Sequence, residues 1–278
     1  MVSYFVNNQV IAENLYSDDC QKKLSICLET NGFSFTVINA DKKMLAFGDI
    51  VCNFPNTLSQ IISLIKQIFS DLRVDFVVMD EVELIVMSNK YTWIPGHLFE
   101  ASHAREYFNL VTPLEVRELV CHDYSEKIQA YSVFAYADTI ISAFKVAIPG
   151  IKIRSQQSKM VESSLLDRSK SKSVIYVYVS KKSLDVCVFS NKNFVLSNSY
   201  VHETTDDIVY YLLLIERQLN LNSENVEVHI SGDIDRKAFT YMEKFFNKLF
   251  LYSGNDSVSF SADEMYKIPL YKYSLFLG

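Results

Sequence analysis

Glycine is scarce in this sequence, with 7 residues among 278, where average usage would give about 20. Backbone amides close around a phosphate only where no side chain intervenes, so Walker-type and dinucleotide-binding loops need several glycines at fixed spacing. The seven glycines are scattered singly, and neither G-x-x-x-x-G-K-[ST] nor G-x-G-x-x-G occurs. The sequence therefore excludes a P-loop enzyme and a simple Rossmann enzyme.

Paired cysteines and an excess of positive charge are also missing. The five cysteines lie far apart and form no C-x-x-C pair, which argues against a disulfide framework and against a zinc site. They are expected to be reduced thiols in the core. The formal net charge is -6, with lysine and arginine spread along the chain, so the electrostatic footprint of a nucleic-acid-binding protein is absent. No nucleic-acid partner and no metal are expected.

Long hydrophobic runs are missing as well. The apolar runs, such as residues 208–215, are far shorter than the roughly 20 residues that a bilayer-spanning helix needs. The first residues carry no basic group before a hydrophobic stretch, so they do not have the pattern of a secretory signal. These observations predict a cytoplasmic location without membrane insertion. Hydrophobic residues make up 49% of the chain, and at this length we expect two lobes.

Residues 24–50 are divided by short polar turns into three runs rich in β-branched and aromatic residues, which predicts three consecutive strands. Asn56 or Thr57 then begins a helical pattern with isoleucines on one stripe. The apolar residues 74–79 predict a further strand. The expected order is three strands, a helix and a strand.

The same order recurs in the second half. Residues 174–201 again contain three strand-like runs, and Thr204 and Asp207 have the spacing of a capping box that begins a helix through Leu219. Residues 226–230 predict the strand that follows it. Corresponding elements are offset by close to 150 residues, because 24 pairs with 174 and 74 with 226. The sequence therefore predicts two copies of one α/β unit.

An insertion of about residues 80–170 lengthens the first copy. Within it, the patterns predict strands at 82–87, 92–94 and 151–154, a helix at 97–110, a hairpin formed by 118–122 and 128–135, and a helix at 137–148. The Ser- and Lys-rich stretch 155–173 marks the boundary between the lobes. We expect a first lobe at 1–170 and a second at 171–278, the latter with a helix from residue 235 to 250.

Two tandem βββαβα units with an insertion in the first resemble the actin, heat-shock chaperone and sugar-kinase superfamily, which is ribonuclease H-like and binds ATP between its lobes. More narrowly, the chain resembles a bacterial family of unknown function with an actin-like fold. The resemblance is carried by the runs LSICLETNGFSFTVI, YTWIPGHLF, LSNSYVHETTDDIVYYLLLIERQLNL and VHISGDID. The resemblance covers most of the chain. It implies a two-lobed α/β protein with the actin-like ATPase fold.

The resemblance also implies where a nucleotide site would lie. Each phosphate hairpin of the superfamily has an Asp that ends a strand, then a Gly turn and a hydroxyl residue. In the first copy the matching residues are Glu29, Asn31, Gly32 and Ser34, with a longer acid, a displaced glycine and Phe33 expected to crowd the approach. The Asn-Gly dipeptide is equally typical of an ordinary hairpin turn.

In the second copy, Lys181, Lys182 and Ser183 stand where the acid and the glycine are expected. Gly232 and Asp233 stand where the superfamily has a Gly-Gly turn against adenosine. Lysines without a metal-binding carboxylate and an open turn favour weak binding over phosphoryl transfer. We therefore predict a degenerate nucleotide site with no resident cofactor, at which weak ATP or ADP binding is the most that is expected.

Other polar groupings do not indicate catalysis. His97, Glu100, His103 and Glu106 recur every third residue, but on a helix this spacing drifts by about 60° per step, so the four side chains cannot face one ion. His122-Asp123 lacks the G-x-S-x-G context of a hydrolase triad.

A group of acids also has an ordinary explanation. Asp80, Glu81 and Glu83 fall between two strand patterns, where acids are normally solvated at a turn. We expect them to be exposed rather than paired for acid-base work.

Two features suggest surfaces for a protein partner. Trp93 lies beside a Pro-Gly turn, and residues 208–215, which include Tyr210 and Tyr211, are apolar around nearly the whole helix. Such a helix is covered on both sides, either by burial between lobes or by a docked partner.

We conclude from the sequence that the chain is a non-catalytic actin-like scaffold or adaptor that binds an unidentified protein partner. This role is similar in kind to the actin-like components of pilus-assembly or division complexes. The alternatives are a nucleotide-binding switch or ATPase with an altered site, and, more weakly supported, carbohydrate binding through the aromatic residues. The oligomeric state is left open.

Overall fold

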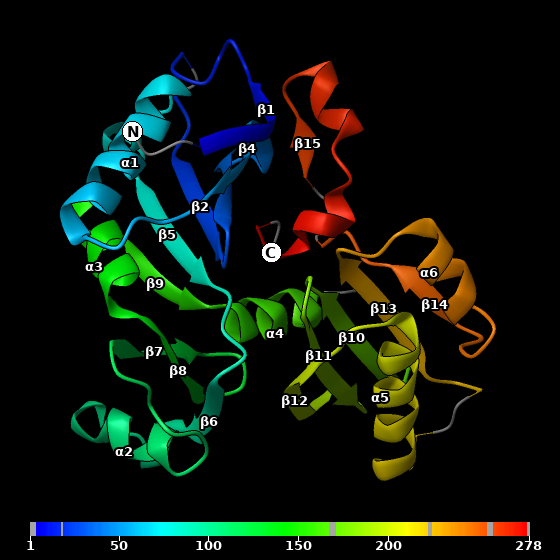
Figure 1. Ribbon diagram of the computed structural model, residues 1–278. Helices are drawn as coiled ribbons and strands as arrows, with labels where there is room; N and C mark the ends of the chain where they lie inside the picture. The colour runs from blue at the N-terminus through cyan, green and yellow to red at the C-terminus, as the bar shows by residue number, and fades with distance from the viewer. Residues whose placement is uncertain (1–3, 18, 167–170, 222–223, 255–257, 277–278) are drawn as a thin grey trace. The chain divides into compact units, whose positions relative to one another are not determined.

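The computed structural model describes residues 4–17, 19–166, 171–221, 224–254 and 258–276 (Figure 1). The chain divides into two compact units, which are described separately. Unit 1 comprises Met1–Ser158 and Ser257–Ile268, and unit 2 comprises Lys159–Asp256 and Pro269–Gly278. The predicted lobe boundary at residue 170 adjoins residues 167–170, which lie outside the described residues.

Unit 1 is built around a seven-stranded sheet, sheet A, in which the order is β1-β4-β3-β2-β5-β9 and β15 pairs with β4. Strands β1 to β4 pair antiparallel, whereas β5 joins β2 and β9 joins β5 in parallel. The strands are β1 (Tyr4–Ile11), β2 (Lys22–Glu29), β3 (Gly32–Asn39), β4 (Lys43–Cys52), β5 (Glu81–Val86), β9 (Lys152–Ser155) and β15 (Ser259–Phe260). The three strands predicted over residues 24–50 are confirmed as β2, β3 and β4.

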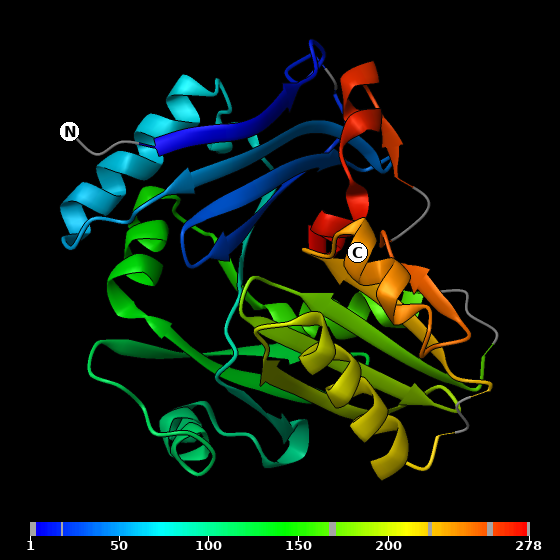
Figure 2. The same cartoon turned by 45° about the vertical axis from the view of Figure 1, so that its right-hand side comes forward.

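One face of sheet A is covered by α1 (Leu58–Asp71) and α3 (Asp138–Ala147), which contact each other (Figures 1 and 2). Helix α1 turns its isoleucine stripe, Leu64 and Phe69 inward, as the spacing predicts. Phe33 of β3 stacks on Phe69 at 5.7 Å and meets Phe144 of α3 edge to face at 5.8 Å. These rings form the centre of the core of unit 1.

The strand predicted at residues 74–79 is wrong. These residues form the turn after α1 and the 3₁₀ helix η1 (Phe76–Val78), and the strand of the unit is β5 instead. The Val74 amide donates to the Phe69 carbonyl, and the Asp75 carboxylate accepts from the Val77 amide. Because these bonds close a turn, Val77 is left 79% exposed. Hydrophobicity alone did not distinguish this turn from a strand.

The insertion forms a second sheet in unit 1, sheet B, with the order β6-β8-β7. Its strands are β6 (Tyr91–Pro95), β7 (Glu118–Ser125) and β8 (Ala130–Ala137). The predicted hairpin is confirmed as β7–β8. The continuous helix predicted at 97–110 is wrong, because the chain makes two 3₁₀ turns, η2 (Gly96–Leu98) and η3 (Ala101–His103), before the short helix α2 (Ala104–Asn109).

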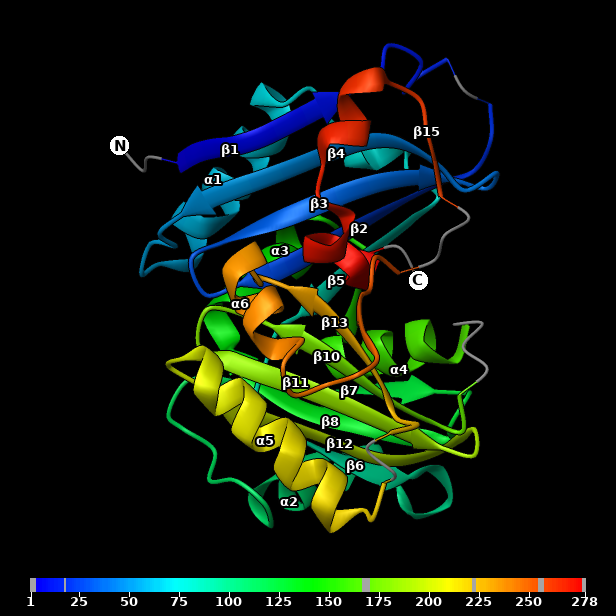
Figure 3. The ribbon, with the colours of Figure 1, turned by 90° about the vertical axis from the view of Figure 1, so that its right-hand side faces the viewer.

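Unit 2 contains a five-stranded sheet, sheet C, with the order β12-β11-β10-β13-β14. Helices α5 and α6 cover one face (Figure 3), while α4 contacts the other through Ser164, which bonds to Cys187 of β11. The strands are β10 (Ser173–Val179), β11 (Ser183–Ser190), β12 (Asn193–Val201), β13 (Glu227–Gly232) and β14 (Leu249–Leu251). The helices are α4 (Gln156–Leu166), which begins in unit 1, α5 (Thr205–Gln218) and α6 (Arg236–Met242); η4 (Asp263–Lys267) in unit 1 and η5 (Leu270–Phe276) in unit 2 follow.

The capping box predicted at the start of α5 is confirmed. The Thr204 hydroxyl accepts from the Asp207 amide, and the Asp207 carboxylate accepts from the Thr204 amide. The helix predicted at 235–250 is too long, because two amides, those of Phe245 and Phe246, turn back to the Met242 carbonyl. This tight turn lets β14 return to pair with β13.

The two units repeat one plan. Three antiparallel strands, a helix and a parallel strand follow one another as β2-β3-β4-α1-β5 in unit 1 and as β10-β11-β12-α5-β13 in unit 2. The strand order also matches, since β4-β3-β2-β5-β9 corresponds to β12-β11-β10-β13-β14. The predicted duplication is therefore confirmed by the topology.

Candidate functional site

The first candidate hairpin is the turn between β2 and β3. Gly32 has a positive φ of 141°, and a Cβ at this position would lie 2.0 Å from the carbonyl oxygen of Ile50. The Asn31 carbonyl accepts from the Cys52 amide at 3.1 Å. Because β4 approaches so closely, Gly32 is required for packing within sheet A whether or not a ligand binds.

The side chains around this turn are mostly buried. Ser34 is 1% exposed, so its hydroxyl is not presented to solvent. The sequence suggested that Phe33 crowds the approach to the turn. This expectation is wrong, because the Phe33 ring lies in the core against Phe69. Glu29 is half-buried at the end of β2, and its carbonyl accepts from the Tyr136 hydroxyl.

The second candidate hairpin is the turn between β10 and β11 in unit 2. The hydroxyls of Ser180 and Ser183 bond to each other at 2.7 Å, and the Ser183 amide donates to the Ser180 hydroxyl. The His202 ring lies 2.9 Å from the Ser180 carbonyl oxygen. The serines are thus used within the turn, and the exposed groups are Lys181 and Lys182.

The turn after β13 has the same character as the first hairpin. Gly232 has φ 87°, and a Cβ there would lie 2.1 Å from the Val179 carbonyl oxygen. The Asp233 amide donates to that same oxygen at 2.7 Å, and its carboxylate lies 3.2 Å from the ammonium of Lys272. In each unit, the candidate glycine therefore faces a backbone carbonyl.

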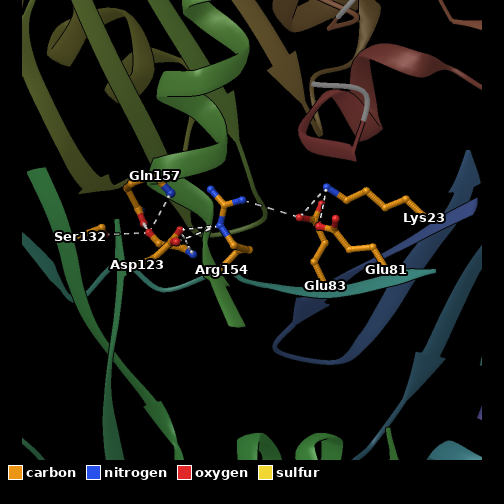
Figure 4. A network of polar contacts seen from close by, with 8 residues as sticks. Lys23, Glu81, Glu83, Asp123, Ser132, Arg154 and Gln157 are labelled. Atoms are coloured by element: carbon orange, nitrogen blue, oxygen red, sulfur yellow. Dashed lines mark hydrogen bonds and ion pairs between the residues drawn. The ribbon is translucent and has the colours of Figure 1, made fainter. Parts of the chain in front are cut away.

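A buried ionic network in unit 1 was missed by the sequence analysis (Figure 4). Glu83 of β5 is completely buried, although acids at 80–83 were expected to be solvated. Its carboxylate accepts from the Ser25 hydroxyl at 2.8 Å and lies 2.9 Å from the Lys23 ammonium. The expectation failed because the strand begins at Glu81, so Glu83 lies within the sheet rather than at the turn.

The network continues through Arg154 of β9. Its Nη1 lies 3.9 Å from Glu83, and its Nε donates to both carboxylate oxygens of Asp123 at 2.9 Å. The Asp123 carboxylate also accepts from the Ser155 amide. The Ser155 hydroxyl accepts from Ser132 and donates to the Gln157 side chain (Figure 4).

These polar side chains satisfy one another, so they indicate a structural connection between sheets A and B rather than a reactive centre. Burial, with smaller effects of Glu29 and Glu83, raises the pKa of the nearby Cys27 thiol well above its usual range. That thiol therefore stays protonated and is a poor nucleophile. The sequence signal that could have revealed the network is the alternation of Lys23, Ser25 and Cys27 on one face of β2.

The other polar groupings are not assembled into a site. His103 pairs with Glu100 at 3.1 Å on the surface. The His122 ring packs 5.0 Å from Phe99, while Asp123 lies on the opposite face of β7. Among the described residues, no three His, Cys, Asp or Glu side chains form a group that could hold a metal ion.

The two candidate partner surfaces differ in exposure. Trp93 is half-buried, and its indole nitrogen is enclosed. Tyr210 is 60% exposed on α5, whereas Tyr211 is half-buried and stacks on Tyr200 with ring centroids 4.4 Å apart. Tyr210 and Leu213 of α5 both face solvent, so the cover expected on this side of the helix stays a prediction.

These features define an α/β protein with a duplicated actin-like plan. The chain belongs to the DUF3822 family of proteins of unknown function, whose model matches residues 13–249. A Bacteroides thetaiotaomicron protein with an actin-like ATPase fold and unknown function superposes with a TM-score of 0.69 and 24% identity, over 87% of this chain and 96% of that chain. No curated protein sequence matches significantly.

A second solved structure, the PilM-PilN type IV pilus biogenesis complex, superposes with a TM-score of 0.59 and 9% identity, over 92% of this chain and 96% of that chain. Both similarities establish that this chain has the actin-like ATPase fold. In the described part of the chain, none of the helices combines the length and apolar character needed to cross a membrane.

Proposed function

We propose that this chain is a cytoplasmic, non-catalytic member of the actin-like fold that serves as a scaffold or adaptor for a protein partner. The observation that carries this proposal is the packing of Gly32 and Gly232, each of which faces a backbone carbonyl at a distance that no side chain would tolerate. These glycines are explained by the fold itself. Their presence therefore does not indicate a phosphate-binding loop.

The chemistry available at the candidate hairpins supports the same conclusion. Phosphoryl transfer relies on positioning and on electrostatic stabilisation by metal ligands and backbone amides. The hydroxyl of Ser34 is buried, that of Ser183 is bonded within its own turn, and the second hairpin has lysines where an acid is expected. Exposed lysines alone attract phosphate weakly, since solvent screens their charge.

Two observations support a role in protein binding. The similar PilM structure was solved as a complex with PilN. In this chain, Tyr210 is exposed on a regular helix whose opposite side is well packed. Tyrosine is enriched at interfaces and at binding hot spots, because one large ring supplies much contact area with little side-chain entropy to lose.

The proposal is tested by affinity capture of the native chain under physiological salt. We expect a protein recovered at near-stoichiometric yield, and we expect Tyr210→Arg to abolish its recovery. Tyr266→Arg is the matched control, because Tyr266 is also exposed but lies in unit 1. Recovery that is unaffected by Tyr210→Arg would contradict the assignment of this surface.

The alternative function, a nucleotide-binding switch, is supported by the exposure of Lys181 and Lys182. It is tested by calorimetric titration of the chain with magnesium ATP and ADP. We expect no saturable heat at millimolar nucleotide. Tight binding that is lost in the Lys181→Ala, Lys182→Ala double variant, or ATP turnover by the purified chain, would replace the scaffold proposal with the nucleotide-dependent function.

A further inference from the structure

The exposed side of α5 carries four residues in a single stripe. Asp206, Tyr210, Leu213 and Arg217 are all exposed, Tyr210 by 60% and Leu213 by 39%. Their spacings of four, three and four residues place them within an arc of about 60° on a helix of 3.6 residues per turn. This is the spacing of a short coiled-coil seam.

The stripe is complementary to a second copy of itself that runs antiparallel. Asp206 and Arg217 lie equally far from the point midway between Tyr211 and Leu212, and so do Tyr210 and Leu213. An antiparallel copy of the helix therefore places an acid opposite a base at both ends. At the centre it places an aromatic ring opposite a leucine.

We propose that a second copy of this chain docks antiparallel on α5, with Asp206 opposite Arg217 of the partner subunit and Tyr210 opposite Leu213 of the partner subunit. The contact is isologous, so one twofold axis generates two ion pairs and two apolar contacts. The inference rests on the proposed scaffold function, because it names the occupant of the same Tyr210 surface.

The position of Asp206 suits such a pairing. Its Oδ1 accepts from the Tyr241 hydroxyl of α6 at 2.6 Å, which restrains the carboxylate while Oδ2 can accept from a guanidinium. Arg217 follows Asp206 by eleven residues, a rise of about 16 Å or three helical turns. The acid near the helix N-terminus and the base near the C-terminus also favour α5 itself, since both complement the helix dipole.

The size of the contact predicts a weak, reversible dimer. A stable interface usually buries about 800 Å² on each partner, and the apolar centre here consists of two side chains from each chain. The ion pairs are partly solvated, so they fix the antiparallel register more than they add affinity. We therefore expect dimerisation that depends on chain concentration and weakens at high salt.

Sedimentation velocity over a concentration series tests the inference with charge-reversed variants. The wild-type chain is expected to dimerise, while Asp206→Arg and Arg217→Asp each place like charges together and weaken the dimer by at least about tenfold. Mixing the two single variants restores both ion pairs in a heterodimer, and the double variant Asp206→Arg, Arg217→Asp restores the homodimer. Thermal unfolding of each variant confirms that it is folded.

A second readout addresses the register directly. Tyr210→Cys chains mixed with Leu213→Cys chains, each in a Cys20→Ser background, are expected to form a disulfide-linked heterodimer under mild oxidation. Tyr241→Phe is the matched control for Asp206, because it removes the bond within unit 2 but leaves the stripe intact, and it should still dimerise.

A wild-type chain that remains monomeric at several hundred micromolar would overturn the inference, and so would a dimer unaffected by charge reversal. Failure of the scaffold proposal gives a different result. A monomeric chain that still captures another protein through Tyr210 contradicts only the dimer. ATP turnover contradicts the scaffold function and leaves the dimer measurement unchanged.

Discussion

The Nε of Arg154 donates to both carboxylate oxygens of Asp123, each at 2.9 Å, and so joins β9 of sheet A to β7 of sheet B. The same guanidinium lies 3.9 Å from Glu83, which in turn lies 2.9 Å from Lys23. Charges of opposite sign therefore alternate along the network. Because its central members are buried, removing one leaves another without its partner in a poorly solvated position.

The first prediction concerns this network. Asp123→Ala should lower the free energy of unfolding by about 3–5 kcal/mol, because it removes the carboxylate whose two oxygens share the hydrogen bond from Arg154 Nε. The matched control is Glu81→Ala, since Glu81 is half-exposed and makes longer ion pairs of 3.5 Å with Lys23 and Lys152. That change should cost at most about 1 kcal/mol. Urea unfolding measures both, and equal losses would show that the network is not a stabilising connection.

The second prediction concerns the two candidate-site glycines. Gly32→Ala and Gly232→Ala should each destabilise the chain by several kcal/mol, roughly the cost of moving packed backbone in addition to a positive φ. Gly150→Ala is the control, because Gly150 also has a positive φ of 83°. Among the described residues, no atom lies within 4 Å of a Cβ placed there. Gly150→Ala should lower the free energy of unfolding by only about 1–2 kcal/mol. A similar loss of stability at all three positions would argue against close packing at Gly32 and Gly232.

The third prediction concerns the start of α5. Thr204→Ala removes the hydroxyl that accepts from the Asp207 amide and should cost about 0.5–2 kcal/mol. Thr57→Ala provides the comparison, because Thr57 occupies the same position before α1 but its hydroxyl bonds to the Gln60 side chain. Chemical denaturation should show the larger loss for Thr204→Ala. The reverse order would contradict the capping assignment.

The fourth prediction is a pH dependence at Glu118. Burial opposes ionisation of this carboxyl, but bonds from the Glu115 amide and from Lys90 outweigh it, so the pKa of Glu118 lies below its ordinary value of 4.5. A lowered pKa in the folded state stabilises the fold above pH 4.5, and this contribution is lost as the pH falls through the folded-state pKa. Glu118→Gln should therefore flatten the decline in unfolding free energy below pH 4.5. An unchanged acid slope would exclude this contribution.

The fifth prediction concerns the thiols. Burial raises the pKa of Cys52 and of Cys121 to about 11 and raises those of Cys27 and Cys187 as well, whereas Cys20 is half-buried. Because the thiolate is the reactive form, Cys20 should react first with a thiol reagent in the native chain. One fast equivalent is expected from native protein and five after unfolding. A Cys20→Ser variant that keeps the fast equivalent would contradict the assignment.

Local signals explain why much of the fold was predictable. Runs rich in β-branched and aromatic residues in β2 to β4 and β10 to β12, divided by short polar turns, specify these strands through neighbours close in sequence, and the Thr204 and Asp207 pair specifies the start of α5 in the same way. The turn at residues 74–79 was not predictable in this way. Its valines resemble a strand, yet backbone bonds to the end of α1 close it, and the actual strand is fixed by pairing with β2.

Composition and spacing in the sequence determined the duplicated α/β plan and the absence of a glycine-rich phosphate loop, while the resemblance to the actin-like superfamily indicated the candidate hairpins. Only the tertiary structure decided what individual residues do there. Gly32 faces the Ile50 carbonyl because β4 pairs with β3. Glu83 is buried because Ser25, Lys23 and Arg154 come from two neighbouring strands. Contacts between residues distant in sequence set burial and hydrogen bonding, and a linear pattern does not contain them.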